Sequence, residues 1–561
     1  MSKTSSTPDF ASKVFHFGKS LHGSKQYLIM QRRNLFAMQE KLGQPSCFFT
    51  LSAADLHWPE LFDLAQHYNK DSTSEELYRS YRKRNETLNS NPMSADWFFT
   101  RRAFKFLKTF LVPVLGFEHY WARIEYQHRG SAHLHGLGWI RDAPDFKTII
   151  KRIKEYPEMD LQYNEKAKLK AVERICAPEG KDIVKFSDWL LSTVNPSFDD
   201  AGDGQMPKVH PSDHPCHQRW RDVKDHDTDY ERLIATVQRH TESKACLKDL
   251  GDGTKLKAFG RYKTKTKRPT NQNPLQLQGW RSNVDMQVCV STFGLAKYVV
   301  KYATKSEPQS TTLAQTFQMI VDGLDKRDPS RKVVSKLLMK SIGERDYSAQ
   351  ETCHLITGDK LVTASREFKT LHLKNKREID LSARSSKASA TVPTTVEEYM
   401  KRSAEAQNLC LMDYDSDYTY NSKGQLRKRG KSLVVRVVPR IPCDPTNAKK
   451  YEQYCYYQLM KYKPFCQLSD LTTAADGEVL SAADSYKRFL ITVGKSLRNK
   501  IEISNDIDAV LTMPFDEASW ESDDDSKKEN KKKGVDQDDW MKLFCPSSAI
   551  NEDLSMEELN A

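Results

Sequence analysis

Apolar positions near the start of the chain follow two different periods, one typical of helices and one typical of strands. Over residues 26–42 apolar residues recur at helical spacing, whereas the short apolar run at 48–52 is typical of a buried strand. A further strand is predicted at 117–124. Between the two strands, residues 95–111 predict a second helix. We expect its apolar stripe to comprise Trp97, Phe98, Phe104, Leu107, Phe110 and Leu111.

The pattern in the rest of the chain is mostly helical. Periodic apolar positions predict one strand at 432–438 and helices at 144–153, 311–324, 330–342, 351–356 and 449–462. Strands and helices together indicate an α+β protein, but local periodicity does not supply its topology.

The most distinctive polar pattern lies at 125–139, where two strands are predicted to form a hairpin. Side chains alternate between the faces of a strand, so Glu125 and Gln127 share one face, as do His133 and His135. Gly130 lies between them and suits a turn. If the strands pair antiparallel, all four side chains can lie on one side of the sheet.

Two imidazoles with a carboxylate or amide oxygen suit a divalent ion such as Mn²⁺ or Mg²⁺ and leave coordination positions open for a phosphate. The alternative is that His133 and His135 belong to an ordinary polar face of a strand.

A second polar pattern lies at 293–305. Tyr298 and Tyr302 are four residues apart, which places both phenols on one helix face, with Lys301 and Lys305 beside them. Basic residues favour a phenolate and bind phosphate. The alternative is an amphipathic helix with two packing tyrosines.

These motifs, in this order, resemble those of a known family. The segments FFTLSAADLHWP (48–59), E-x-Q-x-R-G-x-x-H-L-H (125–135) and Y-x-x-K-Y (298–302) are similar to the three replication-initiator motifs of Helitron rolling-circle transposases. Those proteins are HUH endonucleases of the branch with two tyrosines. The resemblance extends from about residue 31 to about residue 371 and includes TASREF at 363–368.

The resemblance implies a fold and a reaction. The fold is an antiparallel sheet of about five strands flanked by helices. The local pattern after residue 305, and not the resemblance, predicts a mostly helical region and a disordered C-terminal tail. The reaction is the nicking and rejoining of single-stranded DNA. A divalent metal is held by His133, His135 and either Glu125 or Gln127, and Tyr298 or Tyr302 attacks the phosphorus, with Lys301 as an auxiliary group. The product is a 5′-phosphotyrosine and a free 3′-hydroxyl.

Other residues are candidates for DNA contacts. Basic residues interleave with aromatic residues on the helix at 95–111, an arrangement that can grip single-stranded DNA, although core packing also explains the aromatics. The candidate contacts are Arg101, Arg102, Arg129 and Lys305.

A long insert at 155–280 separates the hairpin from the tyrosine motif. In Helitron proteins this region looks like a zinc-binding element, but here Glu242 and Ala258 replace two expected cysteines. Zinc binding and a solvated histidine-rich loop both remain open. The candidate zinc ligands are His210, His214, Cys216, His217, His240 and Cys246.

The composition of the chain indicates which kind of partner it binds. The chain has 561 residues, a net charge of +12 and a pI near 8.9, which favours a polyanionic partner such as nucleic acid. Its 11 cysteines include no Cys-x-x-Cys pair, so a reducing compartment is expected. Neither a signal peptide nor a membrane span is predicted. The basic run at 261–268 suits a nuclear-import signal or a phosphate contact, and a solvated linker is the alternative. We expect nuclear localisation.

The helicase of full-length Helitron transposases has no counterpart here. The two segments that resemble a P-loop, at 17–20 and 493–496, lack its leading glycine, with Lys13 and Phe489 in that place. ATP hydrolysis is therefore not predicted, and a helicase is expected in trans or from a missing C-terminal part.

We expect a disordered segment at 1–24, an endonuclease domain at 25–310, a helical extension at 311–375, an accessory region at 376–520 and a charged tail at 521–561. Ser/Lys/Arg-rich linkers are predicted at 376–391 and 422–432. Two other functions remain open: an inactive DNA-binding protein derived from a Helitron, and an RNA-binding scaffold.

Overall fold

The protein is described here by a computed structural model and divides into two compact units. The described residues of 1–29 and 45–364 belong to the first unit, and those of 30–44 and 365–532 to the second. The predicted helices at 311–324 and 330–342, nearly all of 144–153 and the C-terminal tail lie outside the described residues. The structure describes residues 20–67, 73–78, 80–126, 130–144, 179–192, 214–238, 247–249, 255–257, 272–289, 292, 295, 296, 347–373, 377–380, 389–392, 394–421, 425–474 and 477–512.

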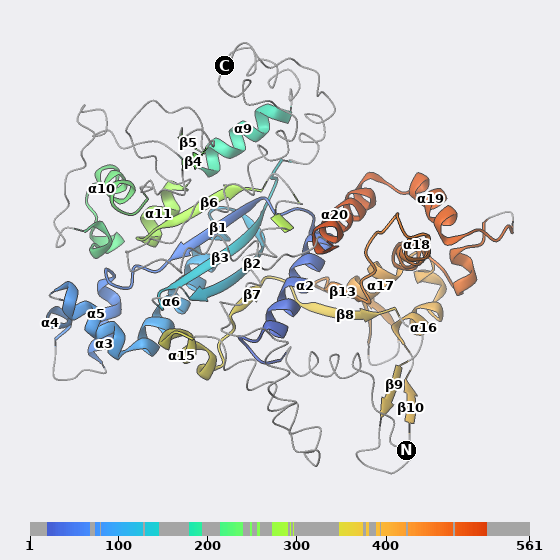
Figure 1. The fold of residues 1–561 in the computed structure, drawn as a ribbon, viewed down its shortest axis with the longest axis horizontal. Helices are drawn as coiled ribbons and strands as arrows, with labels where there is room; N and C mark the ends of the chain where they lie inside the picture. The colour runs from blue at the N-terminus through green and yellow to red at the C-terminus, as the bar shows by residue number, and fades with distance from the viewer. Residues whose placement is uncertain are drawn as a thin grey trace. The chain divides into compact units, whose positions relative to one another are not determined.

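The first unit is built on a five-stranded sheet (Figure 1). The strand order is β6-β1-β3-β2-β7, and every neighbouring pair is antiparallel. This confirms the predicted α+β class with a central antiparallel sheet of five strands. The strands are β1 (Cys47–Ser52), β2 (Phe117–Tyr126), β3 (Ala132–Ile140), β6 (Val284–Val288) and β7 (Val362–Ala364).

The predicted hairpin is formed by β2 and β3. Gly130 has φ +83°, a conformation that L side chains rarely adopt, and β3 begins two residues later. Gly136 is required for a different reason: a Cβ there would lie 2.1 Å from the ring of Phe49. The glycines of the motif thus allow the turn and the close approach of β1 to β3.

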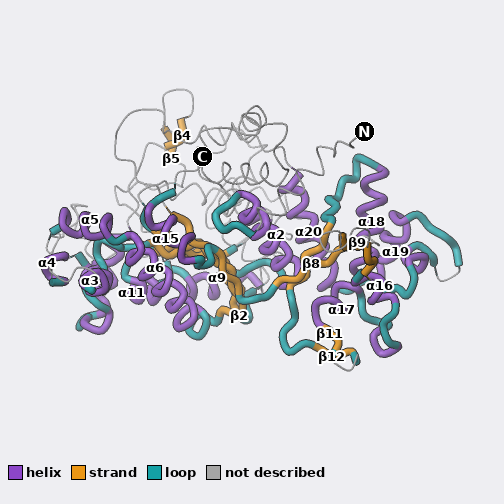
Figure 2. The backbone as a smooth tube through the Cα atoms, turned by 90° about the horizontal axis from the view of Figure 1, so that it is seen from below, coloured by secondary structure: helices purple, strands orange, loops and turns teal. Residues whose placement is uncertain are grey.

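Helices α6 (Pro92–Phe106) and α15 (Ala349–Thr357) lie next to each other beside the sheet (Figure 2). The hydroxyl of Tyr126, from β2, donates to Asp96 of α6, and His354 Nδ1 of α15 lies 3.1 Å from the same carboxylate. These buried polar contacts fix both helices against the face of the sheet that carries Tyr126. The helix predicted at 351–356 is confirmed.

The predicted apolar stripe of the helix at 95–111 is partly wrong. The helix begins at Pro92 and continues as a π-helix over Leu107–Leu111. Trp97 is 46% exposed, and Phe98, Phe104 and Phe110 are only half-buried. The fully buried stripe is Phe99, Ala103, Leu107 and Leu111.

The remaining helices of the first unit are short. They are α3 (Pro59–Gln66), α4 (Ser74–Tyr78), α5 (Tyr81–Ser90), α9 (Glu179–Leu190), α10 (His226–Leu233) and α11 (Pro274–Trp280), with the 3-10 turn η4 (Pro215–His217). Helix α2 (Lys25–Leu42), predicted at 26–42, contributes residues to both units.

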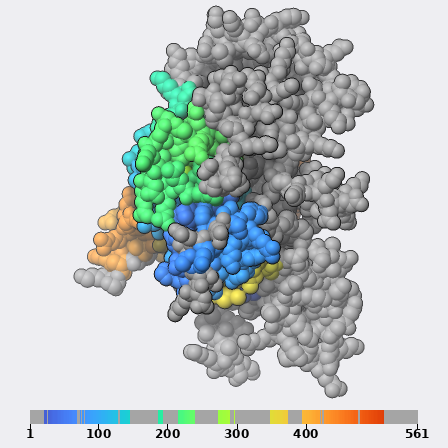
Figure 3. All heavy atoms as spheres, turned by 90° about the vertical axis from the view of Figure 1, so that its left-hand side faces the viewer, coloured from blue at the N-terminus to red at the C-terminus, as the bar shows by residue number. Residues whose placement is uncertain are grey.

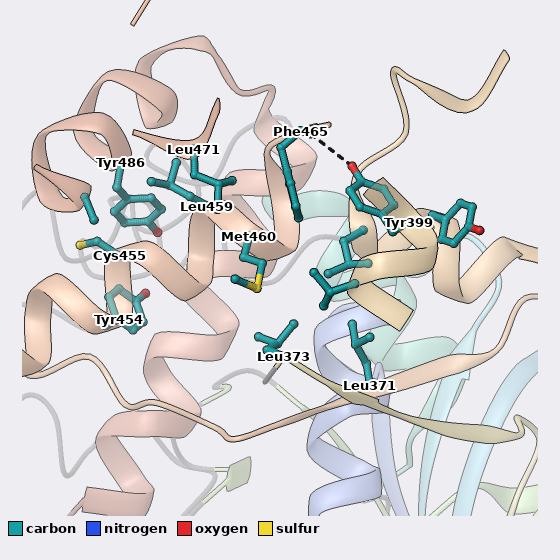
Figure 4. Close-up of a cluster of buried hydrophobic side chains, with 14 of the residues drawn as sticks. Leu371, Leu373, Tyr399, Tyr454, Cys455, Leu459, Met460, Phe465, Leu471 and Tyr486 are labelled. Atoms are coloured by element: carbon teal, nitrogen blue, oxygen red, sulfur yellow. Dashed lines mark hydrogen bonds between the residues drawn. The ribbon is translucent and has the colours of Figure 1, made fainter. Parts of the chain in front are cut away.

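The second unit is mostly helical and packs around α18 (Figure 4). Tyr454, Leu459 and Met460 of α18 are buried against α16, α17 and α19, and the amide of Phe465 donates to the hydroxyl of Tyr399 at 3.4 Å. The predicted strand at 432–438 and helix at 449–462 are confirmed. The helices are α16 (Thr395–Met400), α17 (Leu411–Asp417), α18 (Ala448–Tyr462), α19 (Ala482–Thr492) and α20 (Lys495–Thr512), and the strands β8 (Phe368–His372) and β13 (Val434–Val438) pair in parallel.

The two segments predicted as linkers contain strands. Within 376–391 the strand β9 (Arg377–Asp380) pairs antiparallel with β10 (Ser389–Val392). Within 422–432 the strand β12 (Leu426–Lys428) pairs with β11 (Tyr418–Tyr420). Their composition suggested linkers, but backbone hydrogen bonds between strands do not depend on apolar side chains.

No helix in the described ranges combines the length and apolar character that crossing a membrane requires.

Candidate functional site

Two rows of polar side chains cross one face of the sheet in the first unit. Strand register places Ser52 of β1 opposite His133 of β3, and His133 opposite Glu125 of β2. The second row lies two residues further along each strand. It contains Asp285 of β6, Thr50 of β1, His135 of β3 and Arg123 of β2. Residues directly opposite on paired strands share a face, so the predicted ligands His133, His135 and Glu125 lie together.

A chain of hydrogen bonds orients His133. Asn283 donates its amide Nδ2 to Val237 O and to Gln238 Oε1, both at 2.8 Å, so its Oδ1 faces Ser52. Ser52 donates to that oxygen at 3.3 Å. Since a hydroxyl has one proton, Ser52 Oγ accepts from His133 Nδ1, which lies 2.9 Å away. The lone pair of His133 is therefore on Nε2, the tautomer that a metal ligand requires.

Glu125 and His135 contact each other directly, with Glu125 Oε2 2.8 Å from His135 Nε2. Burial opposes ionisation of Glu125, but the hydrogen bond from His135 and the positive charges of His135 and Arg123 outweigh it and lower the pKa of the carboxyl to about 2. Burial lowers the pKa of His133 to about 3. At neutral pH the site therefore presents a carboxylate and a neutral imidazole.

This donor set fits a divalent ion. Adjacent ligands of an octahedral ion with bonds of 2.0–2.1 Å are about 2.9 Å apart, close to the separation of Glu125 and His135. The rings of His133 and His135 are neighbours, with centroids 4.5 Å apart. Among the described residues, two sets of three possible ligands have their donor atoms within 4.8 Å of one another, and the set Glu125, His133 and His135 is not one of them. One of these three side chains must therefore shift for all of them to bind the same ion.

The other predicted groups of this centre lie outside the described residues. These are Gln127 and Arg129 in the hairpin and, in the tyrosine motif, Tyr298, Lys301, Tyr302 and Lys305. Just before the tyrosines the structure describes Thr292, Leu295 and Ala296, which are buried and helical.

Arg101 and Arg102 of α6 have different surroundings. Arg101 is exposed and lies over the ring of Trp97 at 5.8 Å. Arg102 lies over Trp58 at 4.6 Å and donates to Trp280 O at 3.0 Å. Arg102 also lines a cavity of about 300 Å³. Its other lining residues include Trp58, Lys105, Cys216, Trp220 and Arg281.

Several polar residues of this face were not predicted from the sequence. Arg123 lies two residues before Glu125, and Asp285 alternates with the apolar residues Val284 and Met286, so period-two alternation indicates both. Asn283 has no local signal, because it meets Ser52 only through the pairing of β1 with β6.

Three of the six predicted zinc ligands are described. His214, Cys216 and His217 lie at η4, whereas His210, His240 and Cys246 lie outside the described residues. Cys216 lines the cavity beside Arg102, while His214 and His217 meet His57, which was not predicted as a ligand. Burial is the main cause that lowers the pKa of His57 to about 3 and that of His214 to about 4.

Comparison with known proteins gives one family match. Residues 2–138 match the model of the Helitron helicase-like domain at N-terminus. No curated protein matches the chain. The matched segment contains β1, β2 and most of β3, and so includes Ser52, Glu125, His133 and His135. The N-terminal region of this chain is therefore related to the N-terminal domain of Helitron proteins.

Proposed function

We propose that this protein is a Helitron-like endonuclease and strand transferase that nicks and rejoins single-stranded DNA. The observation that carries this proposal is the grouping of Glu125, His133 and His135 on one face of the antiparallel sheet, inside the segment related to Helitron proteins. An ordinary polar strand face does not require the tautomer of His133 to be set by Ser52 and Asn283.

In this proposal His133 and His135, with Glu125 or Gln127, hold Mg²⁺ or Mn²⁺. When bound, the ion supplies positive charge against the scissile phosphate. Ser52 keeps the Nε2 lone pair of His133 directed away from the hydrogen-bond chain. Arg123, buried in the adjacent row, adds fixed positive charge that favours the carboxylate of Glu125.

Tyr298 or Tyr302 is the proposed nucleophile. Its phenolate oxygen forms a bond to phosphorus while the bond from phosphorus to the 3′-oxygen breaks, which gives a 5′-phosphotyrosine and a 3′-hydroxyl that takes up a proton. Lys301 favours the phenolate through its charge. Two tyrosines allow a second strand to be cut while the first remains attached.

Several features support single-stranded DNA as the substrate. Trp97 is 46% exposed on α6, with Arg101 against its ring and the exposed Lys105 and Lys108 further along the helix. Exposed aromatic and basic side chains on one element bind bases by stacking and phosphates by charge. The net charge of +12 and the basic run at 261–268 agree with a nuclear DNA-binding protein, and strand separation would be supplied by a helicase in trans.

The test is covalent capture. Purified protein is mixed with a labelled single-stranded DNA library and Mn²⁺ or Mg²⁺, and denaturing gels are examined for DNA joined to protein. We expect a metal-dependent adduct that is lost in the double variant Y298F/Y302F and retained in Y81F, a control at an exposed tyrosine. Binding of DNA with no adduct under either metal would instead support the inactive DNA-binding protein.

A further inference from the structure

Three histidines from two distant segments meet beside the sheet of the first unit. His57 Nδ1 lies 2.9 Å from His217 Nε2, and the rings of His57 and His214 stack with centroids 3.8 Å apart and planes at 8°. One ring nitrogen from each of the three lies within 4.8 Å of the others. All three side chains are half-buried, so the cluster is accessible from solvent.

Both segments are held firmly where they meet. His57 precedes Trp58, whose indole is buried and donates to Arg281 O at 3.0 Å, and Tyr78 donates its hydroxyl to His57 O at 2.8 Å. At η4, Arg281 donates to Pro215 O. Arg281 is itself bound to Asp229 of α10 at 2.5 Å. The histidines are therefore carried on anchored backbone. Figure 3 shows the green surface of the segment that contains α10 bordering the blue surface of the N-terminal helices.

We propose that His57, His214 and His217 together bind one zinc ion. Two nitrogen ligands of tetrahedral zinc, each about 2.0–2.1 Å from the metal, are about 3.3 Å apart. His57 and His217 need to separate by only a few tenths of an ångström to reach that spacing. Three protein ligands leave the fourth tetrahedral position for water.

The chemistry of the cluster selects the metal. Imidazole nitrogen suits zinc and other late transition metals, whereas Mg²⁺ and Ca²⁺ prefer oxygen, and the cluster offers no carboxylate among its three donors. Cys216, although next to His217, is not among the three donors and lines the cavity beside Arg102. The proposed zinc site therefore differs from one built from the insert alone, because His57 lies outside the insert, just before α3.

An ion bound here would join the segment that follows β1 to the segment that precedes α10. This assignment does not depend on nuclease activity. Nor does it use the hairpin ligands Glu125, His133 and His135.

Measuring how much zinc the purified protein binds tests the proposal directly. Full-length protein without an affinity tag is loaded with Zn²⁺, dialysed and analysed for metal by mass spectrometry, and Co²⁺ is titrated separately to record the visible absorption of tetrahedral cobalt. H57N and H217Q are the test variants, because each amide can replace the ring nitrogen as a hydrogen-bonding group but is a poor zinc ligand. H67A removes an exposed histidine and is the control.

We expect H57N and H217Q each to carry one zinc equivalent less than the wild type, or to bind it at least tenfold more weakly. H67A and the triple variant E125A/H133A/H135A should keep that equivalent. Zinc should raise the melting temperature of the wild type more than that of H57N, measured against each protein's own metal-free value. Equal zinc content and equal affinity in the wild type, H57N and H217Q would overturn the proposal.

Discussion

At the scale of single residues, the orientation of His133 depends on groups far away in the sequence. Gln238 donates to Val284 O at 2.8 Å and accepts from Asn283, which fixes the amide that receives the hydroxyl proton of Ser52. Each hydrogen bond in this chain determines which atom donates in the next one. The tautomer of His133 therefore follows from the pairing of β1 with β6 and from the position of Gln238.

Ser52→Ala tests this orientation. Loss of the hydroxyl removes the partner of His133 Nδ1, so the ring can rotate and adopt the other tautomer. We expect Mn²⁺ to bind the hairpin about 10–100-fold more weakly, as is usual when a group that orients a metal ligand is removed. Calorimetric titration measures the affinity. The control S90A removes an exposed serine on α5, and unchanged Mn²⁺ affinity in S52A would contradict the role of Ser52.

The residue scale also shows what sequence can predict about the site. Glu125, His133 and His135 are predictable because alternation within two adjacent strands places them on one face. Asn283 and His57 are not, because the contact of Asn283 with Ser52 spans 231 residues of the chain and that of His57 with His217 spans 160, so each forms only in the folded protein.

At the scale of elements, the hairpin was easier to predict than the helix at 95–111. Strand alternation and the turn glycine both indicate the hairpin, and the structure contains it. On α6 the largest aromatic residues were taken for the buried stripe, but position on the helix decides burial. Phe99 and Ala103 face the core, while Trp97 is 46% exposed. Large size alone is a poor guide for tryptophan, which is rarely fully buried.

A pair of truncations measures which face of α6 supports the fold. Phe99→Ala should lower the free energy of unfolding by about 3–5 kcal/mol, because the buried ring leaves a cavity. Trp97→Ala removes an even larger side chain from the exposed face and should change the stability much less. Urea denaturation followed by circular dichroism compares the two variants. A larger loss for Trp97→Ala than for Phe99→Ala would show that the predicted stripe was correct after all.

At the scale of the whole molecule, the two units differ in how much of each is related to a known family. The family match ends at residue 138, so it lies almost entirely within the first unit and touches the second only at residues 30–44. The second unit has its own core around α18 and its own partly buried ion pairs: Arg440 contacts Glu40 at 2.8 Å and Asp508 at 2.6 Å. Its composition suggested linkers at two places where strands pair.

Arg440→Met tests whether this ion-pair cluster stabilises the second unit. The substitution leaves Glu40 and Asp508 without their guanidinium partner. Breaking a fully buried pair costs about 3–5 kcal/mol. Because Arg440 is 31% exposed, we expect a smaller loss of about 1–3 kcal/mol. Thermal unfolding should show a lower transition temperature for the second unit. Arg488→Met is the matched control, since Arg488 and Glu478 are both 57% exposed and such pairs contribute about 0–1 kcal/mol. Equal effects of the two substitutions on the transition temperature would indicate that the ion pairs of Arg440 stabilise the protein no more than an exposed ion pair does.

The central claim is that the polar face of the sheet is a nuclease centre. It is tested most directly by cleavage of labelled single-stranded DNA in Mn²⁺ by the wild type, E125Q and E118Q. Both substitutions remove one carboxylate from β2 and keep the side-chain shape, but Glu125 contacts His135 whereas Glu118 is exposed and paired with Arg141. We predict that E118Q cleaves at the wild-type rate and that E125Q cleaves at least 100-fold more slowly. Equal cleavage by E125Q and E118Q would contradict the assignment of Glu125 to the nuclease centre.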